Sequence, residues 1–185
     1  MKLVLGGSRK LARIPENLVE LLKDFNLENN QFLIGDAPGS DTALQQVLVR
    51  IGAKSVTVYS SAGYIRNNLG NWPSEHINSG LESKSNAVHA FKDRHMTKVA
   101  DWGLMLWDCE SAGTLSNVID LVESGKFCKV WVAQDSELYT FENEISLNQW
   151  LLQYPEVTKE ALKRLKTSRN RTLKRSIVEQ PNLFT

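Results

Sequence analysis

The chain has 185 residues, which suits one domain with a decorated end and allows a sizeable hydrophobic core. Its apolar fraction of 42% and charged fraction of 23% are ordinary for a globular protein. No apolar run approaches the roughly 20 residues that a membrane helix needs, and the short apolar start does not resemble a signal peptide. The two cysteines, Cys109 and Cys128, are too few for a disulfide scaffold or a zinc cluster. We therefore expect a cytoplasmic protein that makes no membrane contact.

The net charge of +1 hides an uneven distribution along the chain. Residues 159–185 contain eight Lys or Arg and two Glu, a balance of +6, whereas residues 1–158 contain 14 basic and 19 acidic side chains, a balance of −5. A basic segment of this kind favours contact with nucleic-acid phosphates. The alternative is a solvated helix face or a contact within a homo-oligomer. A nucleic acid and a second copy of the chain therefore both stay open as partners.

The first third of the chain alternates between apolar strands and amphipathic helices. Pro15 begins the first helix and Gly52 ends the second, as these residues commonly do. The third strand is rich in β-branched residues. In order, the pattern predicts a strand over 2–5, a helix from Pro15, a strand over 32–34, a helix over 43–51 and a strand over 55–59.

No regular apolar period marks residues 60–85. A loop of this length inside a compact domain is usually functional, and its aromatic residues argue against plain disorder. If the loop covers a ligand, the expected contacts are Tyr64, Arg66, Asn67 and Trp72. The regular pattern then resumes, with a helix over 86–100, a strand over 103–107, a helix over 114–123 and a strand over 127–133.

This alternation is typical of βαβ units with right-handed crossovers and a parallel sheet. We predict an α/β fold that is Rossmann-like and doubly wound, with a mostly parallel five-stranded sheet in the order 3-2-1-4-5. Residues 138–141 are expected to be extended or to form a short extra strand, and helices are expected over 146–152 and 157–172. The predicted domains are a Rossmann-like unit over 1–145 and a helical, basic C-terminal extension over 146–185.

Three of the predicted strands end in polar or glycine-rich turns. These turns are GGSR after the first strand, GDAPGSD after the second and DCESAGT after the fourth. In the predicted order these strands are neighbours, so the three turns face one crevice beyond their carboxyl ends, where doubly wound sheets bind ligands. The fourth strand, its turn and the following helix suit an anion in particular, because the first N–H groups and the dipole of a helix attract negative charge.

Each turn has a structural interpretation beside the functional one. Gly6 and Gly7 suit a tight turn as well as a ligand contact. Arg9 pairs with either a phosphate or a surface carboxylate. Asp41 either caps the helix that follows or binds the ligand. The Pro38-Gly39 pair indicates a stretch of backbone that another group approaches closely.

The remaining candidates lie at the ends of the second and fourth strands. Asp36 is placed to accept a hydrogen bond from a ribose hydroxyl, and Ser111 or Thr114 can cap a helix and also reach a ligand oxygen. The predicted ligand-binding residues are Gly6, Gly7, Ser8, Arg9, Gly35, Asp36, Pro38, Gly39, Asp41, Arg66, Asp108, Ser111, Gly113 and Thr114.

No pattern indicates a metal or a cofactor. The three histidines, His76, His89 and His95, lack metal-ligand spacing and are expected at surface or packing positions. The GGSR turn does not match the G-x-G-x-x-G dinucleotide fingerprint, and no Walker or Ser-His-Asp pattern is convincing. Asp36 and Asp108 are the candidates for a catalytic carboxylate, should the protein be an enzyme.

The turns GGSR and GDAPGSD, together with M-x-x-x-A-D-W…L-W-D-x-x-S-x-G-T, resemble the SLOG superfamily of Rossmann-like proteins. This superfamily includes the DNA-processing Smf/DprA proteins, the Lonely Guy phosphoribohydrolases and many small bacterial and phage proteins, to which the chain is most similar. The more distant nucleoside 2-deoxyribosyltransferases share a similar Asp…Gly-Thr turn. The resemblance covers residues 2–133.

The resemblance implies that the crevice binds a nucleotide or a nucleotide-derived molecule, ADP-ribose-like or a nucleoside monophosphate, with its phosphate against Gly113 and Thr114. The phosphoribohydrolases carry a catalytic Glu in the pattern G-T-x-x-E, where this chain has Asn117. An amide cannot act as a nucleophile or base. We therefore expect a nucleotide-binding protein. The alternatives are an enzyme that cleaves or transfers at the N-glycosidic bond of nucleotides or nucleosides, and a protein that binds nucleic acid through its basic C-terminal segment.

Overall fold

The computed structural model describes residues 1–61, 64–78 and 86–167. Within these ranges the chain forms seven β-strands and six α-helices. The strands are β1 (Lys2–Gly7), β2 (Gln31–Gly35), β3 (Val56–Ser60), β4 (Ser74–His76), β5 (Trp102–Trp107), β6 (Cys128–Val132) and β7 (Glu137–Phe141). The helices are α1 (Glu16–Leu27), α2 (Ser40–Arg50), α3 (Asn86–Val99), α4 (Ala112–Glu123), α5 (Glu144–Gln153) and α6 (Pro155–Thr167).

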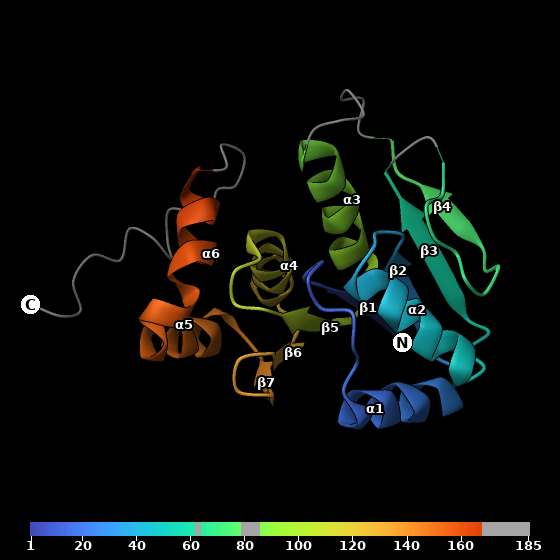
Figure 1. Ribbon diagram of the computed structural model, residues 1–185, viewed down its shortest axis with the longest axis horizontal. Coiled ribbons are helices and arrows are strands. Elements are labelled where there is room, and N and C mark those ends of the chain that lie inside the picture. The colour runs from blue at the N-terminus through green and yellow to red at the C-terminus, as the bar shows by residue number, and fades with distance from the viewer. Residues whose placement is uncertain (62–63, 79–85, 168–185) are drawn as a thin grey trace, which may run out of the picture.

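The strands form one sheet in the order β4-β3-β2-β1-β5-β6-β7. Neighbouring strands are parallel except β6 and β7, which are antiparallel. The five strands expected from the sequence take the predicted order, as β3-β2-β1-β5-β6, so the Rossmann-like α/β fold is confirmed. Two further strands extend the sheet at its edges, and Figure 1 shows β4 and β7 toward opposite ends of the molecule.

Helices cover both faces of the sheet because successive strand residues point to opposite faces. Leu3 and Leu5 of β1 join a hydrophobic cluster with α1 and α2, whereas Val4 joins a second cluster with α3 and α4. β5 alternates in the same way, with Leu104 in the first cluster and Met105 in the second. The central strands are therefore buried on both sides, as expected of a doubly wound sheet.

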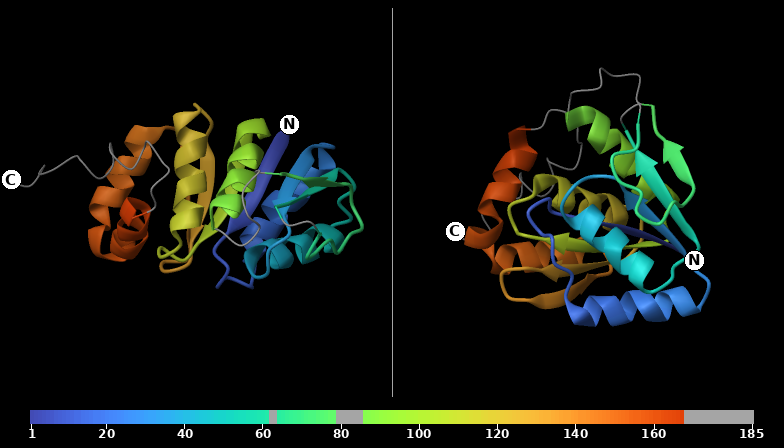
Figure 2. Two further views of the ribbon diagram at one scale, coloured as in Figure 1. Left: turned by 90° about the horizontal axis from the view of Figure 1, so that it is seen from above. Right: turned by 45° about the vertical axis from the view of Figure 1, so that its right-hand side comes forward.

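The C-terminal helices pack on the second of these clusters. Trp150 of α5 lies 5.9 Å from Trp107 of β5 and 5.3 Å from Tyr139 of β7 between ring centroids. Ala161 and Leu165 of α6 are buried in the same cluster. The left view in Figure 2 shows the α5–α6 pair, α4 and α3 following one another along the long axis. A domain boundary at residue 145 stays a prediction.

The structure differs most from the sequence-based expectation at β4, and the helices α2, α4, α5 and α6 begin two or three residues earlier than expected. β4 lies within the segment expected to lack regular structure, and its three residues are all exposed, so they carry no apolar pattern. α4 begins at Ala112 and not at Thr114, because Ser111 takes the N-cap position. Most of the predicted basic segment, from residue 168 onward, lies outside the described residues, as do 62–63 and 79–85. None of the described helices combines the length and the apolar character that crossing a bilayer requires.

Candidate functional site

The three polar turns lie side by side at the carboxyl ends of β1, β2 and β5, because β1 pairs with both of the other strands. The backbone N–H of Ser8 donates to the carbonyl of Leu106 at 2.8 Å, which continues the β1–β5 pairing into the turn. Gly6 and Gly7 end β1 against Met105 and Leu106, where a side chain on Gly7 would overlap with the Leu106 carbonyl. These glycines therefore let the two strands approach each other at the crevice.

A closed hydrogen-bond network joins the turn after β1 to the turn after β5. The hydroxyl of Ser8 donates to Oδ1 of Asp108 at 2.8 Å and accepts from the backbone N–H of Asp108 at 3.2 Å. The same Oδ1 accepts from the backbone N–H groups of Glu110 at 3.0 Å and Ser111 at 2.8 Å. Ser8 is fully buried, so these bonds fix both turns relative to each other. Oδ2 of Asp108 accepts no hydrogen bond from the described residues.

Ser111 caps α4 and leaves donors pointing out of the helix. Its Oγ accepts from the backbone N–H of Thr114 at 3.2 Å and from the hydroxyl of Thr114 at 2.9 Å, so its own proton remains to donate. The N–H groups of Ala112 and Gly113 belong to the first helical turn, which offers them no carbonyl. No acceptor for them is found in the described part of the chain. These three donors lie at the positive end of the helix dipole.

Asp36, at the end of β2, holds Arg66 in an ion pair. Nε of Arg66 donates to Oδ2 of Asp36 at 3.1 Å and Nη2 donates to Oδ1 at 2.5 Å. The backbone N–H of Arg66 also donates to Oδ2, at 3.1 Å, and Asn67 donates to the Asp36 carbonyl at 2.9 Å. Burial alone would raise the pKa of Asp36, but the hydrogen bonds and charge of Arg66 outweigh it and lower the pKa. Asp36 is thus an ionised, fully buried carboxylate with both oxygens engaged.

A second buried carboxylate, Asp41, lies next to Gly35. Its Oδ2 accepts from the backbone N–H of Ala37 at 3.2 Å. Burial raises the pKa of Asp41 to about 6, against the opposing charge of Lys92. Lys92 of α3 is only 4% exposed, and its ammonium lies 3.2 Å from the carboxylate of Asp93. A side chain on Gly35 would overlap with both the Asp41 carboxylate and the Lys92 ammonium, so a larger residue at this strand end would have to displace these charged groups.

Gly39 joins the turn after β2 to the turn after β1. It occupies the N-cap position of α2 with a φ of +88°, a conformation that favours glycine. A side chain at this position would overlap with the backbone of Arg9. Asp41 follows inside the first helical turn, so it is not the N-cap residue of α2. Pro38 and the Arg9 side chain are exposed beside this junction.

His89 of α3 lies at the edge of the same region. Its Nδ1 is 2.7 Å from the hydroxyl of Ser61, which follows β3. Burial lowers the pKa of His89, and the charges of Arg66, Arg9 and Lys92 lower it further. The imidazole is therefore neutral at pH 7 and is surrounded by three cationic side chains.

Helix α6 reaches the turn after β5. The carboxylate of Glu110 in this turn pairs with Lys10 at 2.5 Å. The guanidinium of Arg164 in α6 donates to the Glu110 carbonyl at 3.5 Å. Two basic side chains, one from the segment after β1 and one from α6, therefore lie beside the N-terminus of α4.

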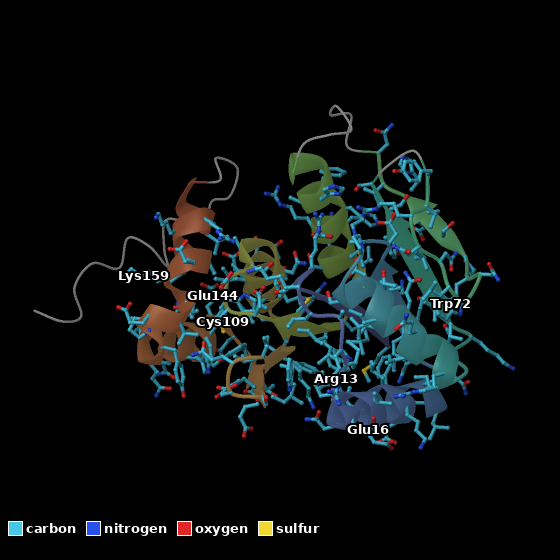
Figure 3. All side chains as sticks on the ribbon, in the orientation of Figure 1. Arg13, Glu16, Trp72, Cys109, Glu144 and Lys159 are labelled. Atoms are coloured by element: carbon cyan, nitrogen blue, oxygen red, sulfur yellow. The ribbon has the colours of Figure 1, made fainter. Side chains whose placement is uncertain are left out.

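Two of the loop residues expected to contact a ligand lie at the site and a third does not. Arg66 and Asn67 lie at the site through their contacts with Asp36. Trp72 is buried instead, and its indole N–H donates to the carbonyl of Ala53 at 2.9 Å, so it is a core residue. Figure 3 shows Trp72 on the side of the molecule that carries β3 and β4, well apart from Cys109 beside α4.

Lys92 is a site residue that no sequence pattern indicates. A lysine in an amphipathic helix is usually solvated, and only the fold brings this one against Asp36 and Asp41. Where the chain is described, no three His, Cys, Asp or Glu side chains gather as a metal ion requires.

Comparison with known proteins gives one structural likeness. No family model matches the chain, and no curated protein matches it. The fold is similar to a solved structure of DNA processing protein A from Helicobacter pylori, from work on its single-stranded DNA binding mode, with a TM-score of 0.56 and 14% identity. The match covers 90% of this chain and 80% of that chain. The predicted link to the Smf/DprA proteins is thereby confirmed at the level of the fold.

Proposed function

We propose that the chain binds a nucleotide-type ligand through a phosphate group at the N-terminus of α4. The observation that carries this proposal is the set of outward donors there: the hydroxyl of Ser111 and the backbone N–H groups of Ala112 and Gly113. Such donors at a helix N-terminus are a recurrent phosphate site. Ser8 and Thr114 act behind them, because their hydroxyls are buried and support the turn.

Asp108 supports a nucleotide over a bare phosphate. Its Oδ1 is engaged by Ser8 and the turn, whereas Oδ2 accepts no hydrogen bond from the described residues. A carboxylate oxygen repels an anion but accepts well from a sugar hydroxyl. A ligand with both a phosphate and a ribose therefore suits this turn. The motifs of the three turns support membership of the SLOG superfamily, and the likeness to DNA processing protein A concerns the fold.

Binding is favoured over cleavage of an N-glycosidic bond. Both oxygens of Asp36 are engaged by Arg66, and an amide, Asn117, stands in the position that resembles the catalytic Glu of the phosphoribohydrolases. A cleaving enzyme needs an available carboxylate near the sugar. Only Asp108, through Oδ2, meets that description among the candidate residues.

The test is a thermal-shift panel of nucleoside monophosphates, ADP and ADP-ribose with the full chain. A ligand at 100 times its dissociation constant adds about 2.7 kcal/mol to the free energy of unfolding. We expect the shift to be lost in Ser111→Ala and kept in Asn143→Ala, which removes the cap of α5 instead. No shift from any nucleotide, or an equal shift in both variants, contradicts the proposal. Free base in the incubated mixture, absent with Asp108→Asn, would instead indicate an enzyme.

A second candidate function is the binding of single-stranded nucleic acid. It is favoured by the fold likeness to a protein studied for its single-stranded DNA binding, and by Lys10 and Arg164 beside the α4 N-terminus. A phosphate-driven interaction of this kind weakens steeply as salt rises. Fluorescence anisotropy with a labelled single-stranded oligonucleotide measures it. Affinity that does not change between low and high salt would exclude this function.

A further inference from the structure

Charged side chains from several segments gather around the turn after β2. The phosphate site at α4 does not use them. We define the β2 charge cluster as Asp36, Asp41, Arg66, His89 and Lys92. These residues come from β2, α2, the segment before β4, and α3, so only the folded chain brings them together. The Asp36–Arg66 ion pair, and the close approach of the Asp41 carboxylate and the Lys92 ammonium to Gly35, place four of them together.

Within this cluster, the Asp36–Arg66 pair has a definite orientation. Asp36 is fully buried, whereas the side chain of Arg66 is 22% exposed, so the carboxylate lies behind the guanidinium. The carboxylate of Asp36 accepts hydrogen bonds from Nε, Nη2 and the backbone N–H of Arg66. Nη1 has no hydrogen-bond partner among the described residues. The carboxylate thus fixes a guanidinium that keeps donors for another group.

The charges of the cluster are layered. Arg9, Arg66 and Lys92 carry as many positive charges as Asp36, Asp41 and Asp93 carry negative ones, but these six side chains differ in burial. Asp36 and Asp41 are buried, and Lys92 lies among them, where burial lowers its pKa but the surrounding carboxylates outweigh this and raise it. The guanidinium groups of Arg66 and Arg9 and the carboxylate of Asp93 lie nearer the solvent. The solvent side of the cluster therefore carries a net positive charge.

We propose that Asp36 is a positioning residue that holds Arg66 to bind a second anionic group of the ligand, separate from the phosphate at α4. The proposal rests on the proposed function, since the first phosphate anchors the ligand. It assigns to Asp36 a role through Arg66 in place of a direct role in catalysis or ribose binding.

The strand order indicates the class of ligand. The two anion positions lie at the ends of β2 and β5, which flank β1. Neighbouring strands are about 4.8 Å apart, so the two strand ends are separated by roughly 10 Å. The phosphates of a diphosphate share a bridging oxygen and are too close together for both positions. Phosphates on the 3′ and 5′ sides of one nucleoside are further apart and suit the spacing. This grouping occurs in a free nucleoside 3′,5′-bisphosphate and in a single nucleic-acid strand.

Isothermal titration calorimetry with AMP, ADP, adenosine 3′,5′-bisphosphate and a short single-stranded oligoadenylate tests this inference. The quantity to compare is the ratio of the AMP dissociation constant to that of each other probe. For the unaltered chain we expect the bisphosphate to bind at least about tenfold more tightly than AMP, as one well-placed charged hydrogen bond provides. ADP should gain much less. Tighter binding of the oligoadenylate than of the bisphosphate would assign the site to a strand, and the reverse to a free nucleotide.

Variants of the pair separate positioning from general stability. Asp36→Asn and Arg66→Met should each reduce the bisphosphate ratio to within about twofold of one, and Arg66→Lys should not restore it, because a lysine cannot make the bidentate contact. Arg66→Met provides the test if Asp36→Asn does not fold. Arg50→Met, at the far end of α2, is the matched control and should keep the full ratio.

The outcomes distinguish the two proposals. If AMP binds but the ratio is near one in the unaltered chain, or survives Arg66→Met, the second anion position is wrong and the phosphate site at α4 stands. If none of the four probes binds, both proposals are wrong.

Discussion

At the scale of single residues, Gly39 lies in a turn whose conformation leaves no room for a side chain. Its positive φ and its contact with the backbone of Arg9 both act against any side chain. We predict that Gly39→Ala lowers the free energy of unfolding by about 2–4 kcal/mol, from the backbone strain and the displacement of Arg9 together. Urea denaturation measures the change.

Gly52 is the matched control for this prediction. It has a similar φ of +69°, but a side chain there meets no atom within 4 Å. Gly52→Ala should therefore lose only the backbone strain, about 1 kcal/mol. Equal losses at the two glycines would contradict the close approach of Arg9 to Gly39.

The two buried carboxylates should respond to pH in opposite directions. Burial raises the pKa of Asp41 to about 6, so the folded state binds its proton more tightly than the unfolded state. Its contribution to stability is therefore fully present below about pH 4 and is lost as the pH rises through 6. The lowered pKa of Asp36 gives the reverse, a contribution present at neutral pH and lost in acid.

For Asp41 this predicts a pH-dependent difference between the unaltered chain and Asp41→Asn. Relative to the unaltered chain, the variant should gain on the order of 2 kcal/mol in free energy of unfolding between pH 4 and pH 7. Urea denaturation at several pH values measures the difference, in which other titrating groups cancel. A difference that is flat across this range would show that Lys92 keeps Asp41 ionised.

Individual site residues could be predicted from the sequence only where a polar turn follows an apolar strand. Ser8, Asp36 and Asp108 follow apolar strands directly, and the structure brings them to one edge of the sheet. That Asp36 is occupied by Arg66 depends on a contact between residues 30 apart, which no local pattern encodes. Lys92 was missed for the same reason.

At the scale of elements, the cap of α4 connects stability to ligand binding. Ser111→Ala removes the side chain that accepts from the Thr114 amide, and it should lower the free energy of unfolding by about 1 kcal/mol. Asn143→Ala removes the comparable cap of α5 and should lower it by a similar amount. Chemical denaturation of both variants, set beside nucleotide binding, separates the two effects. Binding lost in both variants would mean that helix stability alone accounts for the loss.

Where helices pack on the sheet, the boundaries agree with the apolar pattern to within three residues. The pattern placed the start of α4 at Thr114 because Ala112 and Gly113 carry no apolar period. β4 could not be predicted, since its three residues are exposed and it contacts β3 through backbone pairing and the hydrogen bond between His76 and Ser60. The strand order was accessible because parallel βαβ units leave few topologies open.

At the scale of the whole molecule, the uneven charge should be visible in nucleic-acid binding. Four basic residues follow the described part of the chain: Arg169, Arg171, Lys174 and Arg175. If single-stranded nucleic acid contacts them, replacing all four by Gln should reduce the slope of log affinity against log salt by up to about 3, since each phosphate contact contributes about 0.7. Anisotropy titrations from 50 to 300 mM salt, as a rough range, measure the slope. An unchanged slope would assign any nucleic-acid contact to other residues of the chain instead.

The reactivity of the two buried thiols, Cys109 and Cys128, can report local opening of the structure. Cys109 directly follows Asp108 in the candidate site and has a φ of +63°, whereas Cys128 lies in β6 within the sheet. Burial and the charges of Asp135 and Asp108 raise the pKa of Cys109 to about 12, and burial raises that of Cys128, so neither thiol reacts readily in the closed state. Thiol reagents will therefore modify Cys109 when the turn after β5 opens, and Cys128 only when the sheet separates. A ligand bound at the N-terminus of α4 should slow the modification of Cys109 far more than that of Cys128. The rate of Cys109 modification therefore measures ligand occupancy without an attached label.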